Sequence, residues 1–182
     1  MGFLLLSGAM SISPSPALAP RALALPLHVV TLTAYNAVPE QTDNDPLVTA
    51  SGAFSNPEIV AARSRDLAGE LPFGTIIEIA GPSAPHNSCG YGIVAPIIGY
   101  RIIADTMNAR YTNRIDILFD TESNYALANG NVRNAGTILG ICSGASVRVV
   151  GHVDMKKLGR LPKTQKELAA LINGNENILA LK

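Results

Sequence analysis

Short strand-like segments recur along the chain between residues 28 and 153. The first, HVVTLTAY at 28–35, alternates with a period of two, which is typical of a strand with one buried face. Further short segments rich in aliphatic residues follow: PEIVAA, TIIEIA, YRIIAD, RIDILFD and SVRVVGHV. Turn signals containing Gly, Pro or Asn separate them. This pattern of short strands with little helix predicts an all-β domain, either a small barrel or a sandwich.

Other segments depart from the strand pattern. ESNYALAN at 122–129 predicts a two-turn helix that Gly130 closes, and residues 130–145 have no clear period and predict a loop. Near the end of the chain, Thr164 and Glu167 form a capping-box pattern that predicts a short amphipathic helix. That helix either packs on the barrel or extends away from it.

These patterns divide the chain into a leader of residues 1–27, a folded domain of residues 28–153 and a basic tail of residues 154–182. In the leader, an apolar run precedes Pro-rich SPSPALAP, which contains the small-x-small spacing of a signal-peptidase site. We interpret it as a signal peptide, with a disordered leader as the alternative. A signal predicts export to the periplasm or cell wall, whereas a disordered leader allows an intracellular, regulatory barrel. The run is too short for a membrane span, which needs about 20 apolar residues.

Composition excludes few functions. The 182 residues are 47% hydrophobic and 15% charged with a formal net charge of zero, so no general attraction to nucleic acid is expected. Cys89 and Cys142 form a disulfide or remain two buried thiols, because a sequence does not give their separation. His86 and Cys89 have a ligand-like spacing without a second pair nearby, so we predict no metal site and no cofactor.

The stretch DTMNARYTNRIDILFD raises a chemical question, because it places three aspartates close together in a chain with only 14 acidic residues. On the strand RIDILFD, the period of two puts the Ile and Phe side chains on the core face. The other face carries Arg114, Asp116, Leu118 and Asp120. Arg114 favours an ionised Asp116 carboxyl, whereas apolar neighbours raise its pKa, and the sequence leaves both open.

Geometry excludes one simple mechanism. Asp116 and Asp120 lie four residues apart on an extended strand, which separates their Cα atoms by roughly 13 Å. The carboxyl pair of a glycosidase lies about 5 to 9.5 Å apart, so these two residues do not form such a pair. Asp105 ends the preceding strand, and the connection after it is long enough to bring it back beside Asp116.

The order of several blocks resembles a known domain. VTLTAYN, VTASGAF, IVAARSRDL, LPFGTIIEI and YRIIADTMNARYTNRIDILF together resemble the three-aspartate (3D) domain. That domain occurs in the membrane-bound lytic transglycosylase A family and in stationary-phase survival proteins, and it is related to rare-lipoprotein-A-like barrels. The resemblance spans about residues 29–151. It implies a six-stranded double-psi β-barrel that acts on peptidoglycan glycan strands. An envelope protein is a further candidate partner.

The resemblance assigns roles residue by residue. Asp105 and Asp116 match the first two aspartates of the signature, and in lytic members the second is the catalytic acid. Asp120 supplies the last aspartate, and Asp66 falls near another acidic position of the survival-protein branch. Segments that line the family's groove match Thr33, Tyr35, Thr49, Ser51 and Gly52. We add as substrate contacts the neighbours of the aspartates, namely Thr106, Asn108, Arg110 and Arg114.

The chain departs from the family between the two aspartates. Active members have Asp-Thr-Gly-Gly and then Ala-Ile-Lys-Gly, whereas this chain has Met107 and Asn108 in place of the glycines. Asn108 can partly replace a glycine at positive φ, but Met107 cannot. Arg110 is a candidate sugar or carboxylate contact in place of the lysine, and Tyr111 could stack on a sugar.

Two functions follow. The first is a lytic transglycosylase that cleaves the MurNAc–GlcNAc β-1,4 bond to a 1,6-anhydro product, with Asp116 as general acid and then base. In this function Asp105 is also catalytic, because it orients Asp116 or raises its pKa by the proximity of a like charge. The second is a non-catalytic barrel that binds glycan or a protein partner. The retained aspartate spacing favours the first function and the altered loop favours the second. Structural roles also account for the aspartates: Asp120 as a helix cap, Asp105 as a turn residue, and Asp116 paired with an arginine.

Overall fold

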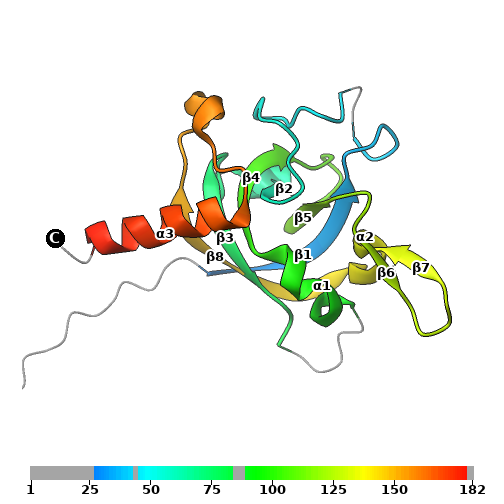
Figure 1. Ribbon diagram of the computed structural model, residues 1–182. Coiled ribbons are helices and arrows are strands. Elements are labelled where there is room, and N and C mark those ends of the chain that lie inside the picture. Colours follow the sequence, from blue (N-terminus) through cyan, green and yellow to red (C-terminus); the bar gives the residue numbers. More distant parts are fainter. Residues whose placement is uncertain (1–26, 43–44, 84–88, 180–182) are drawn as a thin grey trace, which may run out of the picture.

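The computed structural model describes residues 27–42, 45–83 and 89–179, and these residues form a closed six-stranded barrel with short helices around it (Figure 1). Going round the barrel, the strands are β1 (Leu27–Asn36), β5 (Arg114–Phe119), β2 (Val60–Arg63), β4 (Tyr100–Thr106), β3 (Thr75–Ala80) and β8 (Cys142–His152). The predicted all-β class and the predicted strands are confirmed. The pairs β1–β5 and β2–β4 are parallel and the other pairs are antiparallel, which is compatible with a double-psi barrel.

Alternate residues of each strand face the inside and the outside of the barrel. The inner apolar cluster receives side chains from all six strands, among them Ile115, Ile117 and Phe119 of β5. A second apolar cluster lies on the outer side and includes Leu118 of β5. The predicted core face of β5 is therefore correct, and its other face is also partly covered.

Two buried arginines point the same way as the inner residues of their strands. Arg101 is 1% exposed, and its hydrogen bonds within the described residues all go to backbone carbonyls, those of Pro57, Val60, Ile97, Ile98 and Leu118. Burial lowers the pKa of Arg101 to about 10. Arg63 donates to the carbonyls of Ser64 and Leu71 and to the Thr106 hydroxyl. Both guanidiniums satisfy backbone groups inside the fold and serve packing rather than ligand binding.

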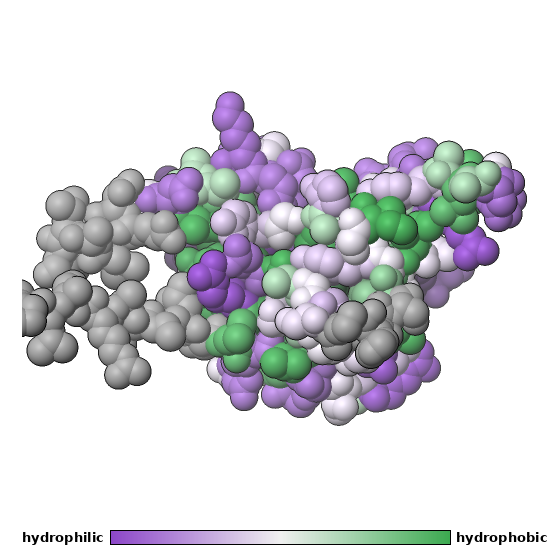
Figure 2. All heavy atoms as spheres, turned by 90° about the horizontal axis from the view of Figure 1, so that it is seen from below, coloured by the Kyte–Doolittle hydropathy of each residue, from purple (hydrophilic) through white to green (hydrophobic). Residues whose placement is uncertain are grey.

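The helix predicted at 122–129 is wrong. These residues belong to a β-hairpin of β6 (Asn124–Ala126) and β7 (Val132–Asn134), which projects from the barrel as a lobe (Figure 1, Figure 2). The amide of Gly130 donates to the carbonyl of Leu127 and closes a four-residue turn that ends in the dipeptide Asn129-Gly130, with Gly130 at a φ of 81°. This dipeptide is a strong hairpin signal, because it accepts the left-handed backbone that a tight turn needs. The short-range turn therefore outweighs the weak helical pattern.

The loop predicted at 130–145 is also wrong in part. It contains β7, the helix α2 (Ala135–Leu139) and the start of β8. Asn134 caps α2, because its side chain accepts a hydrogen bond from the amide of Gly136. Ala135 and Leu139 are buried in the inner cluster, so packing and a cap stabilise a helix too short to show a period.

Cys89 and Cys142 form a disulfide, with their Cα atoms 5.3 Å apart. The bond joins β8 to the segment before α1 (Tyr91–Ile98), a helix that the sequence did not predict. His86 lies outside the described residues. In the part of the chain that the structure covers, no group of His, Cys, Asp and Glu is arranged to hold a metal ion. Within that part, none of the helices has the length and apolar character needed to cross a bilayer.

The tail carries two 3₁₀ turns across residues Met155–Arg160 (η2) and the helix α3 (Gln165–Leu179). The capping pattern is confirmed: the Thr164 hydroxyl accepts from the amide of Glu167, whose carboxylate accepts from the amide of Lys163. Leu168 and Ile172 are buried in the outer cluster, so α3 packs on the barrel and then extends past its edge (Figure 1). A further 3₁₀ turn, η1 (Arg65–Ala68), follows β2.

Candidate functional site

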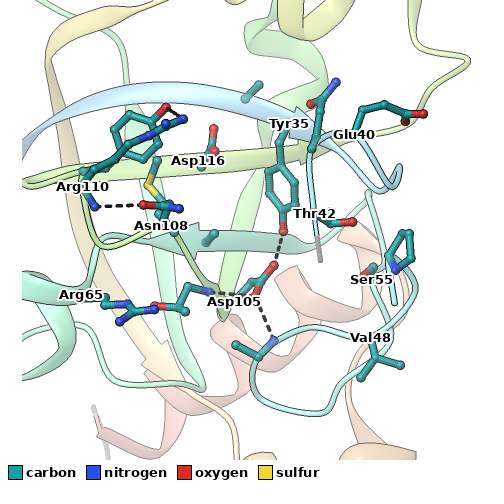
Figure 3. A pocket seen from close by; sticks show the side chains of 18 residues that line it. Tyr35, Glu40, Thr42, Val48, Ser55, Arg65, Asp105, Asn108, Arg110 and Asp116 are labelled. Atoms are coloured by element: carbon teal, nitrogen blue, oxygen red, sulfur yellow. Dashed lines mark hydrogen bonds between the residues drawn. The ribbon is translucent and has the colours of Figure 1, made fainter. Parts of the chain in front are cut away.

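A polar cleft of about 610 Å³ lies on the outer side of the barrel. Strands β1, β2 and β5 contribute Tyr35, Ala62 and Asp116 to it, and segments 40–42, 46–55 and 105–111 supply most of the other lining residues. Tyr35 reaches from β1 to Asp105, and Asp116 lines the same cleft (Figure 3). Of the predicted site residues, the structure places Tyr35, Asp105, Thr106, Asn108, Arg110 and Asp116 in the lining.

Asp116 is set in the middle of three adjacent strands. Its neighbours in register are Thr33 on β1 and Ala62 on β2. The Thr33 hydroxyl donates a 2.7 Å hydrogen bond to the Asp116 carboxyl. Thr33 therefore does not line the cleft, but it holds the Asp116 carboxyl, which does.

Burial raises the pKa of Asp116 to about 6. The hydrogen bond from Thr33 and the charge of Arg114 act in the opposite direction, and the nearby Asp105 carboxylate raises the pKa further. Among the described residues Asp116 forms no salt bridge. Desolvation therefore outweighs the charge of Arg114 in setting the pKa of Asp116, and this carboxyl can both hold and release a proton near neutral pH.

The connection between Asp105 and Asp116 is long enough to bring the two residues side by side, but in the structure they are not direct neighbours. Strand β2 separates β4 from β5, and Ala62 is in register with both aspartates. Two strand spacings place the two Cα atoms about 10 Å apart. Asp105 therefore acts on Asp116 through its charge rather than by a hydrogen bond.

The Asp105 carboxylate instead holds the cleft wall. One oxygen accepts hydrogen bonds from the amides of Ala50 (2.9 Å) and Thr106 (2.8 Å), and the other accepts from the Tyr35 hydroxyl (2.9 Å). Burial and the charge of Asp105 raise the pKa of Tyr35 well above its usual range, so this phenol stays protonated. Asp105 thus joins β1, β4 and the loop around Ala50.

Thr49, Ser51 and Gly52, which were predicted to line the groove, instead stabilise the conformation of this loop. The Thr49 hydroxyl contacts the Ser51 hydroxyl at 3.0 Å and donates to the carbonyl of Ala53, also at 3.0 Å. Gly52 has a φ of 83°, a conformation that favours glycine. Thr49, Ser51 and Gly52 are not part of the lining, and Ala50 and Ser55 of the same loop are.

The loop after Asp105 has Met107 and Asn108 at the two positions where the 3D domain, which the sequence resembles, has glycines. Met107 is 7% exposed and packs in the outer apolar cluster, and its amide donates to the carbonyl of Arg63. Among the described residues, Asn113 is the only non-glycine residue with positive φ, at 50°. Met107 and Asn108 therefore adopt a backbone open to any residue. These two positions therefore carry no backbone strain, and they differ from the 3D domain in the side chains at the rim of the cleft.

That rim carries a tyrosine and two arginines. The guanidinium carbons of Arg110 and Arg114 lie 4.8 and 5.0 Å from the centroid of the Tyr111 ring. Arg110 also donates to the Tyr111 hydroxyl at 2.8 Å. Tyr111 and Arg110 line the cleft, and Arg114 is not part of the lining. These cation–π contacts give the exposed Arg110 a preferred position.

Asp66 and Asp120 lie elsewhere. The Asp66 carboxylate accepts a hydrogen bond from the amide of Asn113 (2.8 Å) and supports the far end of the loop, and hydrogen bonds lower its pKa. Asp120 accepts from the amide of Glu122 in the turn before the hairpin, so its predicted role as a helix cap is wrong because no helix follows. Neither residue lines the cleft.

Five polar residues of the lining were not predicted from the sequence, namely Glu40, Gln41, Thr42, Ser55 and Arg65. They lie in loops or at the start of η1, where no period marks a buried or ligand-facing position. Arg65 and Arg110 lie toward one end of the cleft and Glu40 toward the other (Figure 3).

Neither a scan against protein-family models nor a search of curated proteins finds a match to the chain. The likeness to the 3D domain therefore depends on the quoted blocks of sequence, and the closed six-stranded barrel is compatible with it.

Proposed function

We propose that this chain is an exported lytic transglycosylase with a double-psi barrel of the 3D-domain kind. It cleaves the β-1,4 bond between MurNAc and GlcNAc in peptidoglycan and releases a 1,6-anhydro product. The observation that carries the proposal is the Asp116 carboxyl, which lines an open polar cleft, forms no salt bridge among the described residues and has a pKa raised to about 6.

In this mechanism Asp116 acts twice. The protonated carboxyl donates its proton to the glycosidic oxygen, and the bond from that oxygen to C1 of MurNAc breaks. The resulting carboxylate then takes the proton of the MurNAc 6-hydroxyl as its oxygen forms the new bond to C1. The nucleophile belongs to the substrate, so a single carboxyl suffices, and Asp116 ends the cycle protonated.

The other residues support this carboxyl. Thr33 orients it through the 2.7 Å hydrogen bond, and Asp105 keeps the loop around Ala50 against the cleft. The disulfide between Cys89 and Cys142 supports export, because such bonds persist in oxidising compartments.

The test is mass spectrometry of the products released from purified peptidoglycan by the full chain. We expect 1,6-anhydromuropeptides from the wild type and from Asp154→Asn, a matched change outside the cleft lining, and none from Asp116→Asn. Products with a free reducing end would replace the lytic mechanism by hydrolysis. Equal release by Asp116→Asn would remove this residue from the chemistry.

A second function, non-catalytic binding of glycan, is favoured by one observation. The bulky residues Met107, Arg110 and Tyr111 occupy the loop that carries glycines in active members of the family. Sedimentation of the folded chain with peptidoglycan, without release of any soluble product, would support this alternative.

A further inference from the structure

Four arginines of this protein differ in what their N–H groups bind. Arg101 and Arg63 are buried and spend their N–H groups on backbone carbonyls and one hydroxyl. Arg65 and Arg110 are exposed at one end of the cleft, and neither belongs to an ion pair among the described residues. Their charges are available to a ligand.

The position of Arg110 is set by the protein. Its guanidinium lies over the Tyr111 ring and donates to the Tyr111 hydroxyl, which leaves its other N–H groups for a ligand. Arg114 lies over the same ring and adds positive charge behind it. A guanidinium held in this way loses little conformational entropy on binding and matches a carboxylate with two parallel hydrogen bonds.

The rest of the cleft differs in charge. Asp116 and Asp105 line its middle and Glu40 lies toward the opposite end (Figure 3). An elongated ligand is therefore favoured in a position that brings one of its anionic groups to the arginine end and keeps anions away from the carboxylates. A neutral polysaccharide gains nothing from this arrangement.

From this arrangement, and resting on the proposed function, we propose that Arg65 and Arg110 form a carboxylate-binding end of the cleft, with Arg114 as a supporting charge. The ligand is a glycan strand whose sugars carry a carboxylate close to the cleaved bond. In peptidoglycan this group is either the lactyl carboxylate of MurNAc freed of its peptide, or a carboxylate of the attached peptide.

The experiment uses the full chain and three glycan probes. The first is peptide-bearing strands, the second is strands freed of peptide so that the lactyl carboxylate is exposed, and the third is the second with this carboxylate converted to an amide. Binding is measured by calorimetry and turnover by release of anhydro products. The variants are Arg65→Gln/Arg110→Gln and, as a matched control, Arg133→Gln on the exposed hairpin.

We expect the double variant to raise KM by about tenfold or more for the better of the two charged strands, with a much smaller change in kcat. It should behave like the wild type on the amide strands, and Arg133→Gln should change nothing. The stronger of the two charged probes identifies the source of the carboxylate. Equal wild-type KM for charged and amide strands, or equal loss by the double variant on both, would overturn the proposal.

Failure of the proposed function gives a different result. If none of the strands yields anhydro products, the enzyme assignment falls, and calorimetry still reports on the arginines. Tighter binding of a carboxylate strand than of its amide, lost in the double variant, would then assign the same end of the cleft to a binding protein.

Discussion

The two faces of strand β5 are built in opposite ways. The inner face places Ile115, Ile117 and Phe119 in a cluster to which all six strands contribute. The outer face places Asp116 where burial raises the pKa of its carboxyl to about 6. The inner residues stabilise the barrel. The buried Asp116 carboxylate lowers the stability of the barrel at neutral pH, and its raised pKa allows it to donate a proton in a reaction. The contrast predicts opposite signs for substitutions one residue apart.

The largest expected effect concerns the inner side, where the disulfide joins Cys142 of the inner cluster to Cys89. Replacing both residues by alanine removes a cross-link across 53 positions, which should lower the free energy of unfolding by about 4 kcal/mol. Urea unfolding of the oxidised wild type and of the double variant measures this difference. The wild type with its disulfide reduced is the control and should resemble the variant.

The substitution Ile117→Ala tests the inner face of β5 itself. The side chain is fully buried, so its truncation should cost about 3 kcal/mol through lost burial and the cavity left behind. Ile141→Ala is the matched control, because Ile141 is 64% exposed and should cost less than about 0.5 kcal/mol. Similar losses for both variants, measured by urea unfolding, would show that the inner cluster is loosely packed at β5.

The faces of β5 could be predicted from the sequence, because a period of two assigns alternate residues to opposite sides. The order of strands round the barrel could not. Whether β2 enters between β4 and β5 depends on pairings far apart in the chain, and this insertion decides that Asp105 and Asp116 are separated by Ala62. The closeness of Cys89 and Cys142 depends on the same closure of the barrel.

The candidate site shows a similar limit. Tyr35, Asp105 and Asp116 could be found because they belong to strands or end them, and the resemblance named their positions. Glu40 and Arg65 lie outside the strands, where no pattern tells a residue of the cleft lining from any other exposed polar residue. The sequence does not distinguish the hairpin from a short helix, because a glycine such as Gly130 can end a helix as well as a tight turn.

On the cleft side, Asp105→Ala should destabilise the loop around Ala50, which forms one wall of the cleft. It removes the acceptor for two backbone amides and the Tyr35 hydroxyl, which should cost about 2 kcal/mol. Hydrogen exchange at the amide of Ala50 should accelerate more than exchange in β3, which lies away from the cleft. Asp105→Asn keeps one oxygen for the two amides and should lose less. Uniform acceleration across the barrel would mean that Asp105 supports the whole fold rather than this loop.

The smallest expected effect is the contribution of Asp116 to the free energy of unfolding, which is opposite in sign to that of the inner residues of β5. The pKa of Asp116 is about 6 in the folded chain and close to 3.9 when unfolded, so between these values the folded state holds a proton that the unfolded state has lost. Stability therefore falls as pH rises through this window and stays at its lower level above about 6. Complete burial would make this loss about 3 kcal/mol, and partial exposure reduces it to about 1 to 2 kcal/mol.

Asp116→Asn removes the titrating group and should therefore raise the free energy of unfolding at pH 7 while changing it little near pH 3.5. Asp120→Asn is the control, because the exposed Asp120 serves the turn with an oxygen that asparagine also has. Urea unfolding of both variants at the two pH values decides the matter. A loss of stability in Asp116→Asn at pH 7 would make this carboxylate a structural partner of the barrel. A gain would mean that the fold gives up stability to keep it, which is expected of a residue retained for its chemistry.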